Sequence, residues 1–157
     1  MTDAEIIEKV KSGLAEKAVA VTNPSTRRIF LTVEPRDLIA AVTFLRDELD
    51  FKYLITISGL DRGDSFEILY HFGNAWTCLN VRTSVLKHNP RVESITPVIP
   101  GAILYEREIQ DMFGIIVENI PDARPLLLPD GWPPENHPLR KDWAFQRPVE
   151  KIPGGQA

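Results

Sequence analysis

Proline crowds the end of this chain and limits what that part can fold into. Eight of the thirteen prolines lie between residues 121 and 153. Proline locks φ and lacks an N–H donor, so it interrupts helix interiors and is excluded from central strands. We therefore expect the tail, residues 115–157, to contain no long helix and no central strand.

Large apolar side chains are embedded in the tail, which argues against disorder, because disordered segments are poor in such residues. They are Leu126, Leu127, Leu128, Trp132, Trp143 and Phe145. Burying one such side chain contributes about 1.5–3 kcal/mol, so leaving the three leucines and Trp132 in water would forgo roughly 6–12 kcal/mol. A proline-stiffened strip also loses less entropy when it docks. The tail is typical of a segment that lies along a surface, its own or a neighbour's.

A helix is predicted immediately before the tail, over residues 101–113. Pro100 and Gly101 open it, and Gly114 follows where a helix end favours a residue that can take positive φ. Apolar residues recur at intervals of three and four and define one face. They are Ala102, Tyr105, Ile109, Met112 and Phe113.

Polar residues are expected on the remaining surface of this helix, namely Glu106, Arg107, Glu108, Gln110 and Asp111. Arg107 and Asp111 are four apart and can pair, but an exposed pair contributes only about 0.3–0.5 kcal/mol. Stability alone gives little reason for this cluster. An ordinary solvated face and a surface matched to a partner both remain open.

Four short motifs in fixed order then carry a resemblance. They are Glu106-Arg107-Glu108, Asp111-Met112-Phe113-Gly114, Pro121-Asp122 and Pro138-Leu139-Arg140-Lys141-Asp142. Together they resemble the thirty-kilodalton subunit of respiratory complex I, which is the C subunit of NADH-quinone oxidoreductase. That family includes homologous subunits of energy-converting nickel–iron hydrogenases and formate hydrogenlyases. The clear match spans residues 102–142, whereas the first hundred residues agree only in length and in the order of their elements.

Two positions depart from the family pattern. Ile120 stands where the respiratory subunits usually carry a histidine before Pro-Asp, and Arg124-Pro125-Leu126 replaces a more basic continuation. These departures favour the hydrogenase type over NADH:quinone oxidoreductase itself. The sequence leaves both branches open, together with the electron donor and acceptor and the ion pumped.

The resemblance implies a non-catalytic structural subunit in the peripheral arm of a membrane-associated redox complex. The implied partner is the large hydrogenase-like (forty-nine-kilodalton-type) subunit, which shapes the quinone or nickel site. NADH, quinone, iron–sulfur and nickel–iron centres are then expected only in partner subunits, with no cofactor in this chain. The implied location is the cytoplasmic face of the cell membrane, reached through the partners.

Helix 101–113 and the tail are therefore expected to clasp the large subunit. Arginine and aromatic residues dominate many interfaces, and charges buried there must be matched by the partner. The expected partner-binding residues are Glu106, Arg107, Glu108, Asp111, Phe113, Pro121, Asp122, Arg124, Leu126, Leu127, Trp132, Pro138, Leu139, Arg140, Lys141 and Asp142.

The first hundred residues predict an α+β fold. Helices are expected over residues 2–18 and 35–49, with Thr2 or Asp3 as the first cap. Strands are expected over residues 18–22, 28–33, 53–60, 66–72 and 76–81, the last three as an antiparallel meander. This order predicts a mixed or antiparallel sheet of four to five strands with helices on one face.

Residues 84–100 are expected to be a connection with a short strand near residues 94–98. Such a linker would let helix 101–113 stand off from the sheet. We therefore divide the chain into a sheet domain, residues 1–100, and a partner-binding unit, residues 101–157.

Composition excludes several function classes. The net charge of −4 over 157 residues gives no indication of nucleic acid or an anionic membrane surface as a partner. The single cysteine, Cys78, excludes an intrachain disulfide and suits a reducing compartment. Acidic residues near the N-terminus do not fit a secretory signal, and no apolar run reaches the ~20 residues of a membrane span.

Catalytic candidates are few. None of the three histidines has a metal-ligand partner at suitable spacing, and one cysteine cannot hold an iron–sulfur cluster. The alternative function is a small stand-alone hydrolase that uses Glu108 and Asp111, since two close carboxylates can share a proton. Neighbours on one helix cannot flank a substrate, so only a deep pocket centred on both carboxylates would favour it.

Overall fold

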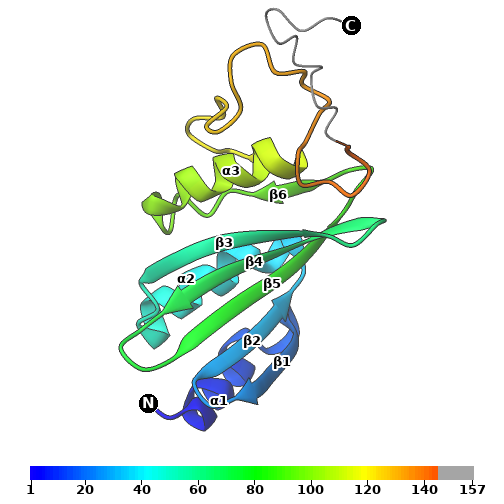
Figure 1. The fold of residues 1–157 in the computed structure, drawn as a ribbon. Helices are drawn as coiled ribbons and strands as arrows, with labels where there is room; N and C mark the ends of the chain where they lie inside the picture. Colours follow the sequence, from blue (N-terminus) through cyan, green and yellow to red (C-terminus); the bar gives the residue numbers. More distant parts are fainter. Residues whose placement is uncertain (145–157) are drawn as a thin grey trace, which may run out of the picture.

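The structure is a computed structural model that describes residues 1–144 (Figure 1). Three helices of three or more turns are present in this part of the chain: α1 (Asp3–Leu14), α2 (Leu38–Leu49) and α3 (Ile103–Phe113). The strands are β1 (Ala18–Ser25), β2 (Arg28–Val33), β3 (Tyr53–Asp61), β4 (Ser65–Gly73), β5 (Cys78–Leu86), β6 (Arg91–Glu93) and β7 (Ile116–Glu118). Short 3₁₀ turns follow α1 and precede α2 and α3.

The main sheet has five strands in the order β1-β2-β5-β4-β3. Strands β3, β4 and β5 form the predicted antiparallel meander, whereas β2 pairs with β5 in parallel. The α+β class and the mixed five-stranded sheet are confirmed. A separate two-stranded parallel ribbon, β6 with β7, joins the end of the sheet domain to the start of the tail.

The helices cover one face of the sheet because the strands alternate apolar side chains toward them. On β4, Phe66, Ile68, Tyr70 and Phe72 are fully buried, while their alternate neighbours point to the opposite face. Helix α2 contributes buried residues at helical spacing from Leu38 to Leu49. Figure 1 shows α1 and α2 behind the sheet.

The first helix begins as predicted at Thr2. The Thr2 hydroxyl accepts from the Glu5 N–H, and the Glu5 carboxylate accepts from the Thr2 N–H, which is a capping box. No helix among residues 1–144 is long and apolar enough to cross a membrane.

Two expectations for residues 84–113 are wrong. The short strand is β6, at Arg91–Glu93, and residues 94–98 are not a strand. Helix α3 does not stand off from the sheet but packs on β3 and β4. The Phe113 ring lies 5.8 Å from the Phe66 ring, and a Cβ at Gly59 would come within 2.5 Å of Phe113. An apolar helix stripe gains more from covering the sheet than from remaining in water.

Candidate partner-docking site

Glu106 is fully buried, so its expected place on the polar surface of α3 is wrong. Its carboxylate accepts hydrogen bonds from the Ser94 hydroxyl (2.7 Å) and the Ile95 N–H (2.7 Å). Burial raises the pKa of Glu106, although these hydrogen bonds act in the opposite direction. Residue 106 therefore ties α3 to the segment that precedes it, where Val98 and Ile99 donate back to the Ile95 carbonyl in a turn.

Spacing carries the signal for this buried carboxylate. Residues 102, 106, 109 and 113 recur at intervals of four, three and four, and all four are buried. Glu106 thus lies within the apolar stripe. The sequence prediction nevertheless placed every charged residue of this helix on its surface, because burying a carboxylate costs free energy unless hydrogen bonds compensate it.

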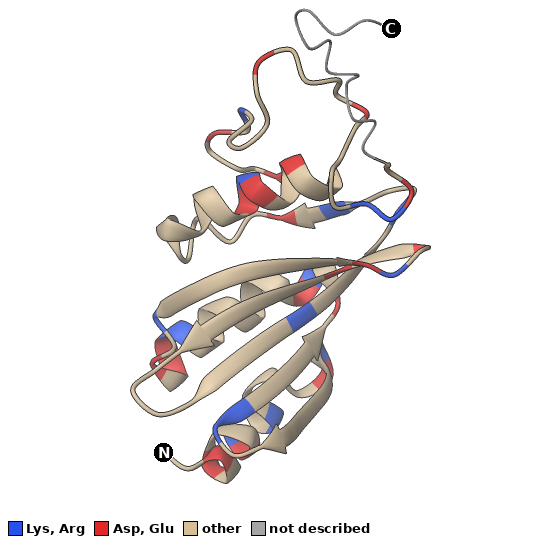
Figure 2. Ribbon diagram, in the orientation of Figure 1, with Lys and Arg blue, Asp and Glu red and all other residues tan. Residues whose placement is uncertain are grey.

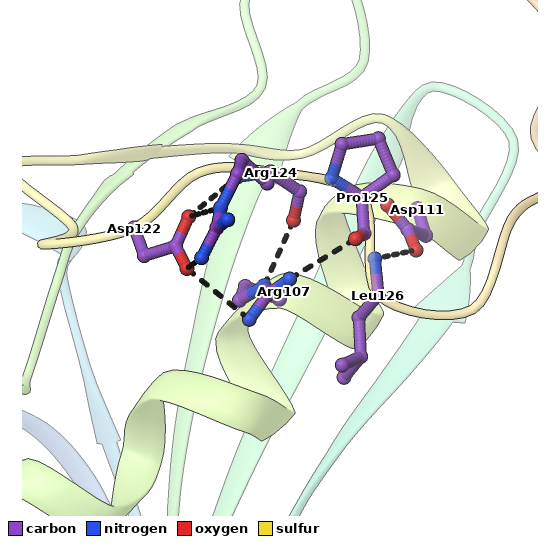
Figure 3. Close-up of polar contacts among 6 residues, drawn as sticks. All are labelled: Arg107, Asp111, Asp122, Arg124, Pro125 and Leu126. Carbon is purple, nitrogen blue, oxygen red and sulfur yellow. Dashed lines mark hydrogen bonds and ion pairs between the residues drawn. The ribbon is translucent and has the colours of Figure 1, made fainter. Parts of the chain in front are cut away.

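Arg107 binds the tail instead of its own helix. Its Nε donates to the Arg124 carbonyl (2.8 Å) and its Nη2 to the Pro125 carbonyl (3.0 Å), while Nη1 lies 3.4 Å from the Asp122 carboxylate (Figure 3). The pair with Asp111 that their spacing permits is not among the ion pairs of residues 1–144. The planar guanidinium suits this arrangement because its donors form a fixed fork.

Asp111 is buried and also holds the tail. Its Oδ2 atom accepts from three successive N–H groups, those of Leu126 (2.8 Å), Leu127 (2.7 Å) and Leu128 (3.3 Å). Successive backbone N–H groups that converge in this way form an anion-binding concavity. The bond to Leu126 is drawn in Figure 3. The two residues whose spacing permits a pair thus bind adjacent parts of the same turn of the tail.

Asp122 and Arg124 brace that turn. The Arg124 guanidinium donates to both Asp122 oxygens, at 2.9 and 2.7 Å, and the Arg124 N–H donates to Oδ1. The hydrogen bonds from Arg124, with the charge of Arg107 beside them, lower the pKa of Asp122. Arg124 is exposed, so this pair shapes the loop more than it stabilises the fold.

The tail then returns to cap the C-terminus of α3. The last carbonyls of a helix lack partners within it. Here the Asp111 carbonyl contacts His137 Nδ1 (3.0 Å), the Met112 carbonyl accepts from the Leu139 N–H (3.0 Å), and the Phe113 carbonyl accepts from Arg140 Nε (2.6 Å). Gly114 adopts the predicted positive φ of 68°. The tail therefore completes α3.

A further anchor joins the end of the described tail to the sheet. The Asp61 carboxylate accepts from the Lys141 N–H (2.9 Å), the Gly63 N–H (2.8 Å) and Lys87 Nζ (3.0 Å). Lys87 also pairs with Asp142 at 3.0 Å. Burial acts to raise the pKa of Asp61, but these donors lower it to about 2.

Sequence reasoning missed Asp61 and Lys87. They lie at the ends of β3 and β5, 80 and 54 residues before Lys141, so no local pattern connects them to the tail. Only the return of the chain to the β3–β4 turn brings them together. Figure 2 shows charged residues gathered on α3 and near this end of the sheet.

The contacts that hold residues 122–142 against α3 and the sheet leave apolar side chains on the outer surface. Leu126, Leu127 and Leu139 are 37%, 55% and 55% exposed. Trp132 is half-buried, with its ring 6.2 Å from that of Trp143, while Phe145 lies outside the described residues. The other expected partner-binding residues divide by exposure. Phe113 is buried, Pro138 is half-buried, and Glu108, Pro121, Arg124, Lys141 and Asp142 are exposed.

A hollow of about 660 Å³ lies between α3 and the tail, with Arg107, Asp111, Leu128, Trp132 and His137 among its lining residues. Glu108 does not line it, and the accepting oxygen of Asp111 is already taken by the tail. The structure therefore does not assemble the carboxylate pair that the hydrolase alternative requires. Among residues 1–144 no group of three or more His, Cys, Asp or Glu side chains is arranged to hold a metal ion.

Comparison with known proteins decides the family. The profile of the family described as respiratory-chain NADH dehydrogenase, 30 Kd subunit, matches residues 31–149. The NADH-quinone oxidoreductase C subunit of Roseiflexus sp. (strain RS-1) is 36% identical over 151 residues, covering 90% of this chain and 84% of that protein. The chain belongs to this thirty-kilodalton subunit family. The corresponding protein of Mesorhizobium japonicum is 35% identical, and the match covers 94% of this chain and 77% of that protein.

Solved structures share the fold of this family member. A chain of the membrane-bound sulfane sulfur reductase, an archaeal respiratory membrane complex, aligns with a TM-score of 0.77 at 23% identity, covering 90% of this chain and 85% of its own. A trypsin-resistant fragment of Nqo5 aligns with a TM-score of 0.65 at 20% identity, covering 78% of this chain and 99% of the fragment. At these identities the likeness concerns the fold alone.

Proposed function

We propose that this thirty-kilodalton-type chain is a non-catalytic subunit that docks onto the large catalytic subunit of a complex-I-like redox complex through the outer face of its tail. Family membership makes the chain a thirty-kilodalton-type component of such an assembly. The proposal that the tail docks onto the large subunit rests on one observation: the inner side of the tail is bound by polar groups of its own chain, whereas its outer side carries exposed leucines. Arg107 and Asp111 bind the tail within the chain, while Leu126, Leu127 and Leu139 remain outside.

This division supports a docking surface because residues 122–142 are already held against α3 and the sheet within the chain. Arg107, Asp111 and the capping contacts fix its backbone, so binding costs little further entropy. The leucines are therefore held on the outside at a cost in solvation. Covering the exposed part of each contributes about 1 kcal/mol, so the three together are worth about 3 kcal/mol, or about 100-fold in affinity.

The redox chemistry is proposed to reside in other subunits. With one cysteine, this chain cannot supply the thiolate set of an iron–sulfur cluster. NADH, quinone and metal centres would then be bound elsewhere in the complex, on the cytoplasmic face of the membrane. Both an NADH:quinone oxidoreductase and an energy-converting hydrogenase or formate hydrogenlyase fit this role.

Co-purification tests the docking surface. The triple variant Leu126→Ser, Leu127→Ser, Leu139→Ser removes the outer apolar groups without touching the hydrogen-bonding side chains that hold the tail. We expect it to fold, with some loss of thermal stability because each leucine is about half covered by its own chain, and to lose the large subunit during affinity purification. The matched control is Leu104→Ser, because Leu104 is 53% exposed on α3 outside the docking surface.

Full recovery of the large subunit by the triple variant would refute the docking surface. Mass spectrometry of the large subunit recovered with the wild type then separates the two branches. Nickel-ligating cysteine pairs in that partner identify the hydrogenase type, and their absence identifies quinone reduction.

A further inference from the structure

A second candidate surface lies at the end of the molecule away from the tail. There the β4–β5 connection, residues 74–77, meets the start of α1 and the β1–β2 turn (Figure 1). Trp76 is 67% exposed, and the guanidinium carbon of Arg27 lies 5.9 Å from the centroid of its ring. Arginine and tryptophan are the residue types most enriched where binding energy concentrates.

The backbone that presents Trp76 is fixed by hydrogen bonds. The Asn74 side-chain oxygen accepts from the Trp76 N–H (2.9 Å) and the Thr77 N–H (2.8 Å), and the Asn74 N–H donates to the Thr77 carbonyl (3.1 Å). The indole therefore projects from a closed turn. An exposed aromatic ring on an ordered turn loses little conformational entropy when a partner covers it.

Asp3 joins this turn to Arg27. Its carboxylate accepts from the Arg27 N–H (2.6 Å), the Asn23 side-chain amide (3.1 Å) and the Thr77 hydroxyl (3.1 Å). The hydrogen bond from the Arg27 backbone is the main reason that the pKa of Asp3 is lowered. The Asp3 oxygens are thus occupied by neutral donors of its own chain, and its charge is attracted by the nearby Arg27 side chain.

Arg27 is held in an unfavourable backbone conformation, with φ of 63°. A non-glycine residue pays about 1 kcal/mol or more for the left-handed region, and it persists there only where surrounding contacts enforce it. The Asp3 carboxylate provides that enforcement. None of the ion pairs among residues 1–144 joins the Arg27 guanidinium to a carboxylate, although the charge of Asp3 attracts it, so its donors remain available beside the indole.

These side chains border a hollow of about 460 Å³, lined by Met1, Thr2, Asp3, Ala4, Thr26, Arg27, Trp76 and Thr77. We propose that this hollow is a second protein-docking site, which takes an acidic segment of another subunit of the assembly. A carboxylate of that segment binds the Arg27 guanidinium, and an apolar side chain beside it covers Trp76. The Arg27 guanidinium selects this occupant, because it lies on the indole face and would repel a second cation, while the Asp3 carboxylate in the same lining already accepts three hydrogen bonds within the chain.

Zero-length crosslinking of the assembled complex tests this site. A carbodiimide joins a lysine amine only to a carboxylate in direct contact, so the Arg27→Lys variant converts the proposed ion pair into a covalent bond. We expect a crosslink from position 27 to an aspartate or glutamate of another subunit. Arg36→Lys, at an exposed arginine elsewhere on the surface, is the matched control and should give no such crosslink.

Hydroxyl-radical footprinting of the wild-type protein provides the second measurement. We expect oxidation of Trp76 to fall at least fivefold between the isolated chain and the assembled complex. A crosslink from position 27 only to Asp3 of the same chain, or equal oxidation of Trp76 in both states, would overturn the proposal. The tail lies at the other end of the molecule, so either result leaves the tail-docking proposal to its own test.

Discussion

Replacing Asp111 with alanine should release the tail from α3 while leaving the sheet folded. The carboxylate holds three N–H groups at 2.8, 2.7 and 3.3 Å. A hydrogen bond to a charged acceptor contributes about 1.5–3 kcal/mol. The longest bond counts least, and the groups are only partly buried, so we take the lower value for the two short bonds and expect a loss of about 3 kcal/mol.

Amide hydrogen exchange measures this loss directly. Local opening exposes the amides of residues 126–128, and a cost reduced by about 3 kcal/mol speeds their exchange about 100-fold. Core amides on β4 should exchange at the wild-type rate. The control is Glu108→Ala, since Glu108 is exposed on the same helix and is not among the residues of the described chain that hydrogen-bond the tail turn.

Exchange at residues 126–128 within threefold of wild type in Asp111→Ala would refute the reasoning. It would mean that Arg107 and the capping contacts hold the turn without the carboxylate. Asp111→Asn separates charge from hydrogen bonding, because its amide oxygen can still accept. We expect its exchange rates to lie between those of wild type and Asp111→Ala.

Three further predictions concern the contacts that hold residues 122–142 against α3 and the sheet. Gly114→Ala should lower the free energy of unfolding by about 2–4 kcal/mol in chemical denaturation, since φ is positive and a Cβ would collide with His137 and Arg140, whereas Gly101→Ala, in open space, should cost under about 1 kcal/mol. Asp61 has its pKa lowered from 3.8 to about 2, so its stabilisation is present above about pH 4 and is lost as the pH falls toward 2. Asp61→Asn should therefore be about 2 kcal/mol less stable than wild type at pH 7 and nearly equal to it at pH 2, as measured by chemical denaturation at each pH. A difference in the free energy of unfolding that does not change with pH would contradict the role of the ionised Asp61 carboxylate. Arg107→Lys cannot reproduce the fork to two carbonyls, so the amide hydrogens of residues 126–128 should exchange at least tenfold faster than in wild type, and an unchanged rate would show that charge alone suffices.

Local pattern determined much of this fold. Alternation along β4 and helical spacing along α2 each report on the few residues around them, and both elements form where that spacing predicts. The end of α3 follows from Gly114 for the same reason, because the need for positive φ is local. The family motif could be recognised because its members keep fixed order within about forty residues.

The roles of the motif residues were decided by tertiary structure. Glu106 and Asp111 carry charges, and charge alone assigns them to the surface, because burying an ion is costly unless hydrogen bonds compensate. Those bonds come from Ile95 and from residues 126–128, which reach the helix only after the chain folds back.

The sequence by itself therefore determined the three helices, the strands of the main sheet, the family and the apolar character of the tail. Only the folded chain decided which side of the tail faces inward. Periodicity is a property of neighbours along the chain, whereas the bond from the Lys141 N–H to Asp61 spans eighty residues. No local pattern encodes a contact that depends on the path of the whole chain between its two ends.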